Sequence, residues 1–271
     1  MNRAHALALA AAAIFTTTMP SAACAQASNP NAWQFRVALY GYLPDVTGKS
    51  SFPTGNLTPN IDVDAGDILK IQGAFMATLE AQYQRFGVWS DYIYVDLGSD
   101  KSGTRSFSIG NAGVPAGVSA DLHYKLRGSI WTIAGTYRVL ADPASTLDVL
   151  AGARLADVRE TLDWNFSADL GPLQPARTGS STDKVTNWDA IVGVKGRLGF
   201  GPDRQWFVPY YLDVGTGESD FTWQGLAGIG YSVSSWDFAL AWRYLDYHFK
   251  SGSSIETAKF SGPLIGVAFR W

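Results

Sequence analysis

The chain has 271 residues with a formal net charge of −3, and 46% of its residues are hydrophobic and 13% aromatic. A single cysteine excludes a disulfide scaffold, and a charged fraction of 17% excludes a charged disordered protein. The net negative charge argues against a broad basic surface for nucleic acid.

The first 25 residues have the pattern of a secretory signal peptide. Arg3 provides the positive start, residues 6–15 form an apolar run, and Ala23 and Ala25 occupy the small-residue positions of a cleavage site. The apolar run is too short for a membrane-spanning helix, which needs about 20 residues. We therefore expect residues 1–25 to be a cleaved signal peptide.

The same region allows a second interpretation. The segment from Ser21 to Cys24 is faintly similar to a lipoprotein acylation motif, with Cys24 as the modified residue, although such motifs usually have a branched apolar residue where Ser21 lies. Either interpretation predicts export from the cytoplasm. Residues 26–271 are then expected to form one domain.

Alternation of apolar and polar residues dominates this domain. In residues 33–43, apolar side chains occupy every second position and mostly polar ones lie between them, which a strand separates and a helix would mix. Nine further runs read as strands: 71–85, 87–97, 118–140, 147–166, 184–200, 205–214, 220–233, 236–250 and 257–271. In the run 87–97, Asp91 and Tyr92 leave the phase open, and a phase change near Gly128 predicts a β-bulge.

The connections between the runs tend to alternate in length. Residues 44–70, 98–117 and 167–183 are long and polar, and we expect them to be loops. Residues 85–87, 141–146, 200–204 and 234–235 are short turns. Ten strands would place both chain ends beside the short turns.

These patterns fit a barrel in a lipid bilayer. A spanning sheet must close on itself, with apolar side chains toward lipid, polar ones toward the lumen and aromatic rings at the interfaces. Tryptophans near run ends suit such aromatic girdles: Trp33, Trp89, Trp131, Trp188, Trp206, Trp223, Trp236 and Trp271. We predict an all-β, closed antiparallel transmembrane β-barrel of ten strands, with eight as the alternative. A soluble β-sandwich or lipocalin-like barrel would instead point its apolar face inward.

The segment from Gly262 to Trp271 resembles the closing strand of bacterial outer-membrane barrel proteins, which alternates apolar residues and ends in an aromatic one. Residues 223–231 and 242–247 are also similar to uncharacterised proteobacterial barrels of this size. The resemblance implies location in the bacterial outer membrane. It also implies that Phe269 and Trp271 form an assembly signal for the barrel-assembly machinery. It implies no activity.

Charged and polar residues opposite the apolar positions are the candidates for the lumen lining: Arg36, Glu80, Asp121, His123, Lys125, Arg127, Arg154, Asp189, Lys195, Arg197, Asp213 and Arg243. In a narrow barrel they form either a network of ion pairs or the lining of a small-solute path. We favour a non-enzymatic structural or interaction protein of the cell envelope with a polar, partly filled lumen. The alternative is a passive pore, and the expected partners are outer-membrane lipid and lipopolysaccharide.

Catalytic and metal sites find little support. His248, Ser251 and Glu256 could suggest a lipid-modifying enzyme, but Ser251 is three residues from His248 and would lie on the opposite strand face. Asp62, Asp64 and Asp67 cluster without the rest of a calcium loop. We predict no catalytic residues, no metal and no cofactor.

Overall fold

The computed structural model describes residues 32–50, 60–63, 73–102, 108–109, 112–113, 118–142, 144–168, 176–250 and 255–271. The predicted signal peptide, residues 1–25, lies outside this part. Among the described residues, no helix is long and apolar enough to cross a membrane.

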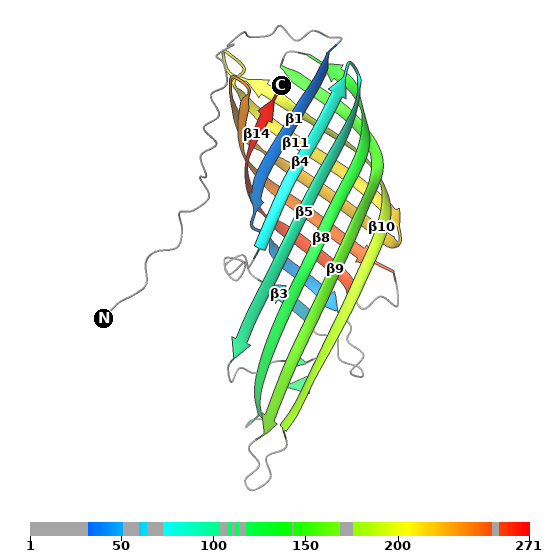
Figure 1. The fold of residues 1–271 in the computed structure, drawn as a ribbon, viewed down its shortest axis with the longest axis vertical. Coiled ribbons are helices and arrows are strands. Elements are labelled where there is room, and N and C mark those ends of the chain that lie inside the picture. The colour runs from blue at the N-terminus through cyan, green and yellow to red at the C-terminus, as the bar shows by residue number, and fades with distance from the viewer. Residues whose placement is uncertain are drawn as a thin grey trace, which may run out of the picture.

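Ten antiparallel strands form a closed barrel (Figure 1). They are β1 (Trp33–Tyr42), β4 (Gly73–Tyr83), β5 (Phe86–Ser102), β8 (Val118–Ala141), β9 (Ser145–Ala168), β10 (Ala176–Phe200), β11 (Trp206–Gly217), β12 (Ser219–Val233), β13 (Trp236–Phe249) and β14 (Ile255–Arg270). The ring closes because β14 pairs with β1, from Arg36 opposite Arg270 to Tyr42 opposite Leu264. The prediction of a closed ten-stranded barrel is confirmed.

Four short strands accompany the barrel: β2 (Asp45–Ser50), β3 (Asn60–Val63), β6 (Ser108–Ile109) and β7 (Ala112–Gly113). β2 continues the register of β1 along β14, and between the two strands Leu43 N–H donates to the carbonyl of Pro263 at 3.0 Å. A Cβ on Gly262 would collide with the Leu43 carbonyl, so only glycine allows this close approach. Because β2 and β3 pair with each other, the prediction that residues 44–70 form only a loop is wrong.

Three strands are much longer than a membrane requires. β8 and β9 have 24 residues each and β10 has 25, and with β5 they run past the shorter strands in Figure 1. Strand therefore includes parts of the predicted loops 98–117 and 167–183. Apolar and polar residues alternate along a strand only where one of its faces contacts lipid. These extensions are held by hydrogen bonds between the backbones of neighbouring strands, which require no such alternation.

The register of β8 contradicts the predicted bulge near Gly128. β5 and β8 pair without interruption from Phe86 opposite Tyr137 to Ser102 opposite Asp121. The irregularity of β8 lies instead between Arg138 and Leu140, against β9.

The two faces of the wall have opposite chemistry. Phe238 and Leu240 are 50% and 54% exposed on the outside, whereas Arg154 and Arg243 are 0% and 2% exposed inside. A soluble barrel would reverse this arrangement, because burying a charge beside exposed apolar side chains gains nothing in water. The wall is therefore of the transmembrane type.

Aromatic rings encircle the end of the barrel that carries the short turns, which we call the turn end. Neighbouring rings pack at centroid distances of 5.2 Å for Trp33 and Tyr83, 4.9 Å for Trp206 and Tyr231, and 4.8 Å for Trp236 and Phe269. Such a girdle suits the bilayer interface.

One tryptophan of the predicted girdles lies elsewhere. Trp89 points into the lumen and packs on Tyr211 with ring centroids 5.0 Å apart. The sequence did not show which face of β5 points inward. In the structure Asp91 lies on the inward face with Trp89, and Tyr92 lies on the outside.

Candidate functional site

The lumen of the barrel is the candidate site, and a network around Arg154 crosses it. Arg154, on β9, forms an ion pair with Asp213 on β11, and both side chains are fully buried. Its other donors reach Thr132 Oγ1 at 3.2 Å and Thr222 Oγ1 at 3.4 Å. Tyr211 donates to the same carboxylate of Asp213. The guanidinium of Arg154 thus connects its own strand, β9, with β8, β11 and β12.

A second network surrounds Arg243 on β13. Its Nη2 donates to Asp91 Oδ2 at 2.6 Å and to Gln224 Oε1 at 2.9 Å. Its Nη1 donates to the hydroxyl of Tyr40 at 2.8 Å, and that hydroxyl donates to Asp91 Oδ1 at 2.7 Å. Thr78 Oγ1 also donates to Asp91 Oδ1, at 2.9 Å. The charge of Arg243 is therefore compensated across the lumen, as burial requires.

The next network, toward the turn end, joins β10 to β4. Lys195 Nζ lies 2.6 Å from Glu80 Oε1 and 3.7 Å from Asp148 Oδ2. Arg138 binds Asp148 in a bidentate manner, with Nε–Oδ1 at 2.8 Å and Nη2–Oδ2 at 3.0 Å. Two cations and two carboxylates therefore balance in this layer.

The network nearest the turn end has three cations around one carboxylate. Asp237 lies 3.1 Å from Arg270 Nη2, 3.6 Å from Arg36 Nε and 3.7 Å from Arg197 Nη1. Ser232 donates to it at 2.6 Å. This network consequently has more cations than carboxylates.

Together these four networks form what we call the charged plug. It includes seven of the predicted lumen residues: Arg36, Glu80, Arg154, Lys195, Arg197, Asp213 and Arg243. Asp189 is also buried and accepts a hydrogen bond from the backbone N–H of Ser219 at 2.8 Å.

Two predicted lumen residues lie on the outer face. Lys125 and Arg127 are exposed, and Arg127 binds Asp96 at 2.7 Å. The prediction was wrong for them because it assumed a phase change at Gly128 that β8 does not make. Asp121 and His123 belong to the same strand, opposite Asn165 and Asp163 of β9, and their side chains are outside the described part.

Sequence reasoning missed several members of the plug: Tyr40, Asp91, Arg138, Asp148, Gln224 and Asp237. Asp237 and Gln224 alternate with apolar neighbours and could have been found by the same test. Asp91 was missed because the sequence of residues 87–97 did not show which strand face points inward. Arg138 was missed because it lies at the irregularity of β8.

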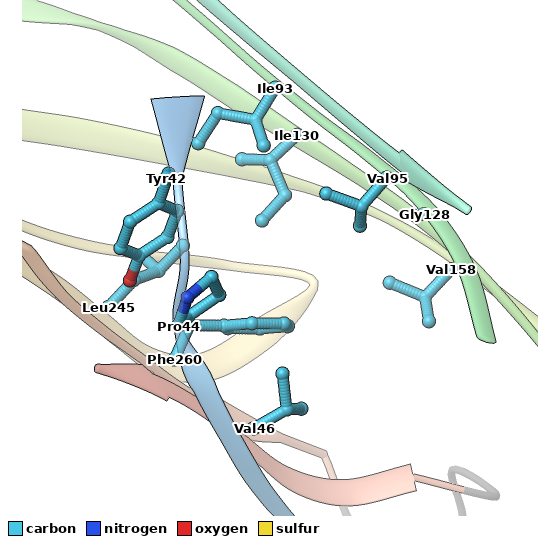
Figure 2. Close-up of a pocket in the computed structure, with 10 residues that line it drawn as sticks. All are labelled: Tyr42, Pro44, Val46, Ile93, Val95, Gly128, Ile130, Val158, Leu245 and Phe260. Atoms are coloured by element: carbon cyan, nitrogen blue, oxygen red, sulfur yellow. The ribbon is translucent and has the colours of Figure 1, made fainter. Parts of the chain in front are cut away.

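Beyond the plug, the lumen becomes apolar toward the end that carries the longer connections, which we call the loop end. Figure 2 shows Tyr42, Ile93, Ile130, Leu245 and Phe260 facing a common cavity. The expectation of a polar lumen therefore describes only part of its length.

The candidate catalytic set lies only partly within the described residues. His248 is exposed on the outer face, 3.4 Å from Asp246, and Ser251 lies outside the described part. No group of three or more potential metal ligands occurs among the described residues; of the predicted acidic cluster, only Asp62 lies within that part.

This barrel geometry has a counterpart among solved structures, although no known sequence family matches the chain. No protein-family model and no curated protein sequence matches the chain. Among solved structures, the outer membrane protease OmpT from Escherichia coli is similar with a TM-score of 0.55, over 90% of this chain and 98% of that chain, at 8% identity. The chain has the fold of bacterial outer-membrane β-barrel proteins.

Other barrels of this class are similar at lower scores. Ail, the attachment invasion locus protein of Yersinia pestis, matches 88% of this chain and 98% of its own at 12% identity, with a TM-score of 0.30. Neisserial surface protein A matches 88% and 97% at 13% identity, with a TM-score of 0.25.

Proposed function

We propose that this protein is an integral barrel of the bacterial outer membrane that does not conduct solutes and serves the envelope as a structural or interaction protein without enzymatic activity. The observation that carries the proposal is the charged plug. Arg154 and Arg243 are buried in the lumen and bound by partners from several strands.

A filled lumen opposes conduction for an energetic reason. A passing ion needs water or fixed charges to replace its hydration shell, yet the carboxylates of Asp213 and Asp91 are already bound to Arg154 and Arg243. Separating Arg243 from Asp91 would leave a buried charge without its partner, which costs about 3–5 kcal/mol. The plug therefore favours a closed barrel over the alternative of a passive small-solute pore.

Planar-bilayer recording separates the two functions. The wild-type barrel should show no resolvable channel. The variant Arg154→Ala/Arg243→Ala, which removes both central cations, serves as the positive control and should give measurable current. Steady conductance of the wild type, comparable to that of this variant, would establish the pore instead.

The absence of enzymatic activity is tested separately. Ser251→Ala and His248→Ala should leave the lipid A of the expressing cells unchanged in mass. A changed lipid A in either variant, relative to wild type, would revive a lipid-modifying enzyme.

A row of cations on the outer face supports lipopolysaccharide as a partner. In the register of β8, β9 and β10, Arg127 lies opposite Arg159, and Arg159 lies opposite Lys184. All three side chains are exposed. Like charges directly opposite one another repel, so an anionic group between them would be stabilising.

The height of this row suits the phosphate level of the outer leaflet. Trp131 and Trp188, whose rings lie 6.5 Å apart, form the aromatic level of these strands. The cations follow four residues further along each strand, about 13 Å at 3.3 Å per residue. Asp96 binds Arg127 at 2.7 Å and Asp157 lies 3.0 Å from Lys184, so two carboxylates reduce the excess charge of the three cations without cancelling it.

Native mass spectrometry of detergent-extracted protein tests this partner. Arg159→Ser/Lys184→Ser should retain less lipopolysaccharide than wild type, and Arg85→Ser, at the exposed turn between β4 and β5, should not differ. Equal retention by all three proteins would refute the site, as would equal binding of dephosphorylated lipid A.

The assembly machinery is a further proposed partner. Trp271 exchanges backbone hydrogen bonds with Phe35 at 2.9 and 3.1 Å, and its ring stacks on Phe269 with centroids 5.6 Å apart. Phe269→Ala/Trp271→Ala should slow machinery-assisted insertion more than spontaneous insertion into thin bilayers. Equal slowing would indicate a purely structural role.

A further inference from the structure

The network nearest the turn end holds more positive charge than its own carboxylate neutralises. Arg36, Arg197 and Arg270, which we call the arginine cluster, lie between 3.1 and 3.7 Å from the carboxylate of Asp237. Asp237 compensates one of these three charges and leaves an excess of two. The neighbouring network between β10 and β4 is balanced by itself, so it offers the cluster no spare anion.

The turns around this mouth of the barrel do not supply the missing negative charge. The described turns carry two exposed cations, Arg85 and Arg204, and two exposed carboxylates, Asp142 and Asp203. These charges balance one another. A terminal carboxylate on Trp271 would offset one more positive charge and would still leave one. The arginine cluster therefore lacks a full set of counter-charges among the described residues.

Two guanidinium groups of the cluster are held in place by neutral partners. Arg197 lies over the ring of Phe207, with its Cζ 4.0 Å from the ring centroid, and its Nη2 donates to Ser232 Oγ at 3.1 Å. Arg270 Nη2 donates to the backbone carbonyl of Ser234 at 3.1 Å. An aromatic face and neutral oxygens orient a cation without neutralising it, so both groups are charged and preorganised.

The cluster also has hydrogen-bond donors that the protein leaves unused. The contacts of Arg36 Nε and Arg197 Nη1 with Asp237, at 3.6 and 3.7 Å, are ion pairs that are too long for hydrogen bonds. Arg270 Nε is buried and has no hydrogen-bond partner among the described residues. Because a buried donor without an acceptor is costly, an oxyanion bound beside Arg270 would be stabilising.

The cluster is open to solvent although its carboxylate is not. The side chains of Arg36, Arg197 and Arg270 are 35%, 29% and 38% exposed, whereas that of Asp237 is 2% exposed. In outer-membrane barrels the short turns face the periplasm. A periplasmic solute can therefore reach the cluster without crossing the rest of the charged plug.

The cations approach Asp237 from opposite walls of the barrel. β10, which carries Arg197, lies across the ring from β1, with four strands between them on either side. Arg270 on β14 lies directly opposite Arg36 on β1 in the strand register. Donors from two walls suit a tetrahedral phosphate, whose oxygens point in several directions, better than a planar carboxylate with two oxygens in one plane.

We propose that the arginine cluster binds the phosphate group of a small periplasmic solute, either inorganic phosphate or a phosphate monoester. A phosphate monoester carries a charge of about −1.5 to −2 at pH 7, which matches the excess of two cations. The inference goes beyond the proposed function because it assigns a ligand to the periplasmic mouth, and it does not depend on whether the barrel conducts.

Isothermal titration calorimetry with inorganic phosphate tests this site on the folded barrel in non-ionic detergent at low ionic strength. Wild type should bind one phosphate saturably. Arg197→Gln and Arg270→Gln should each weaken the affinity about tenfold or more, because each removes a charged donor. Arg85→Gln removes the same charge from an exposed turn at the same end, and it should change the affinity by less than about twofold.

The variants should keep the barrel folded, because each leaves two cations beside Asp237, and the heat-modifiable band checks this. Arg36→Gln provides a third variant from another strand and should weaken the affinity to a similar extent. Absence of saturable binding by wild type would overturn the proposal. An equal loss of affinity in Arg85→Gln would also overturn it, because it would indicate general attraction to a positive mouth.

Two further ligands identify what the cluster recognises. Glycerol phosphate that binds as tightly as inorganic phosphate would identify phosphate monoesters as ligands, whereas binding about tenfold weaker would restrict the site to free phosphate. Succinate carries two charges on planar carboxylates and should bind about tenfold more weakly than phosphate. Equal affinity for succinate would contradict the assignment of phosphate.

Discussion

The guanidinium of Arg243 on β13 lies 2.6 Å from the carboxylate of Asp91 on β5, although 152 residues separate the two in the chain. Both side chains are almost fully buried, at 2% and 4% exposure. The pair connects two walls of the barrel and marks the boundary between the charged and the apolar parts of the lumen.

Replacing one member of this pair should be costly. Asp91→Asn leaves Arg243 buried without its counter-charge, so the free energy of unfolding should fall by about 3–5 kcal/mol. Asp157→Asn removes the same charge from the exposed pair with Lys184 and should cost less than about 1 kcal/mol. Urea titration in lipid vesicles measures both, and equal losses would show that the lumen pair contributes no more than a surface pair.

The fold followed from the sequence because lipid imposes a simple rule on spanning strands. Trp33, Phe35 and Leu39 had to share one face if the segment crossed a bilayer, and the structure exposes all three. The same rule failed where lipid is absent. Residues 176–183 of β10 show no alternation, and it is their backbone pairing with β9 that identifies them as strand.

The site was less predictable because it depends on contacts between distant strands. Alternation identified Arg154 and Asp213 as inward residues, but not that they bind each other. It also placed Lys125 and Arg127 inside, because a phase change at Gly128 was the simplest account of a mixed pattern. The apolar cavity could not be predicted, since Ile93 and Leu245 were indistinguishable from lipid-facing residues until the register was known.

Close strand packing at Gly152 gives a second prediction. A Cβ there would collide with the carbonyl of Ile133 and lie 2.5 Å from Ala134 Cα, both backbone atoms. Gly152→Val should therefore lower the free energy of unfolding by about 1–3 kcal/mol, the usual cost of overpacking. Gly135→Val, whose Cβ would meet only Ala151 O at 3.9 Å, should change it by less than about 0.5 kcal/mol. Similar stability of the two variants in urea titration would contradict this account of the wall.

A charge placed on the outer face should be costly in proportion to its depth. Leu240 is exposed near the middle of β13, so Leu240→Arg should destabilise the barrel by about 2–4 kcal/mol. Thr186→Arg, beyond the Trp131–Trp188 level, should cost about 0–1 kcal/mol. The measurement is vesicle unfolding in urea. If Leu240→Arg were as stable as Thr186→Arg, the outer face would not be in hydrocarbon.

A nitroxide scan along β13 tests most directly which face of the wall meets lipid. Single cysteines are introduced at positions 238, 239, 240 and 241, in a background in which Cys24 is replaced by serine, and are spin-labelled. The effect of oxygen on the spin relaxation of each label is then measured in lipid vesicles. Oxygen concentrates in hydrocarbon, so labels at 238 and 240 should relax strongly and labels at 239 and 241 weakly, with a period of two. The opposite phase, with strong relaxation at 239 and 241, would contradict the inside-charged, outside-apolar barrel.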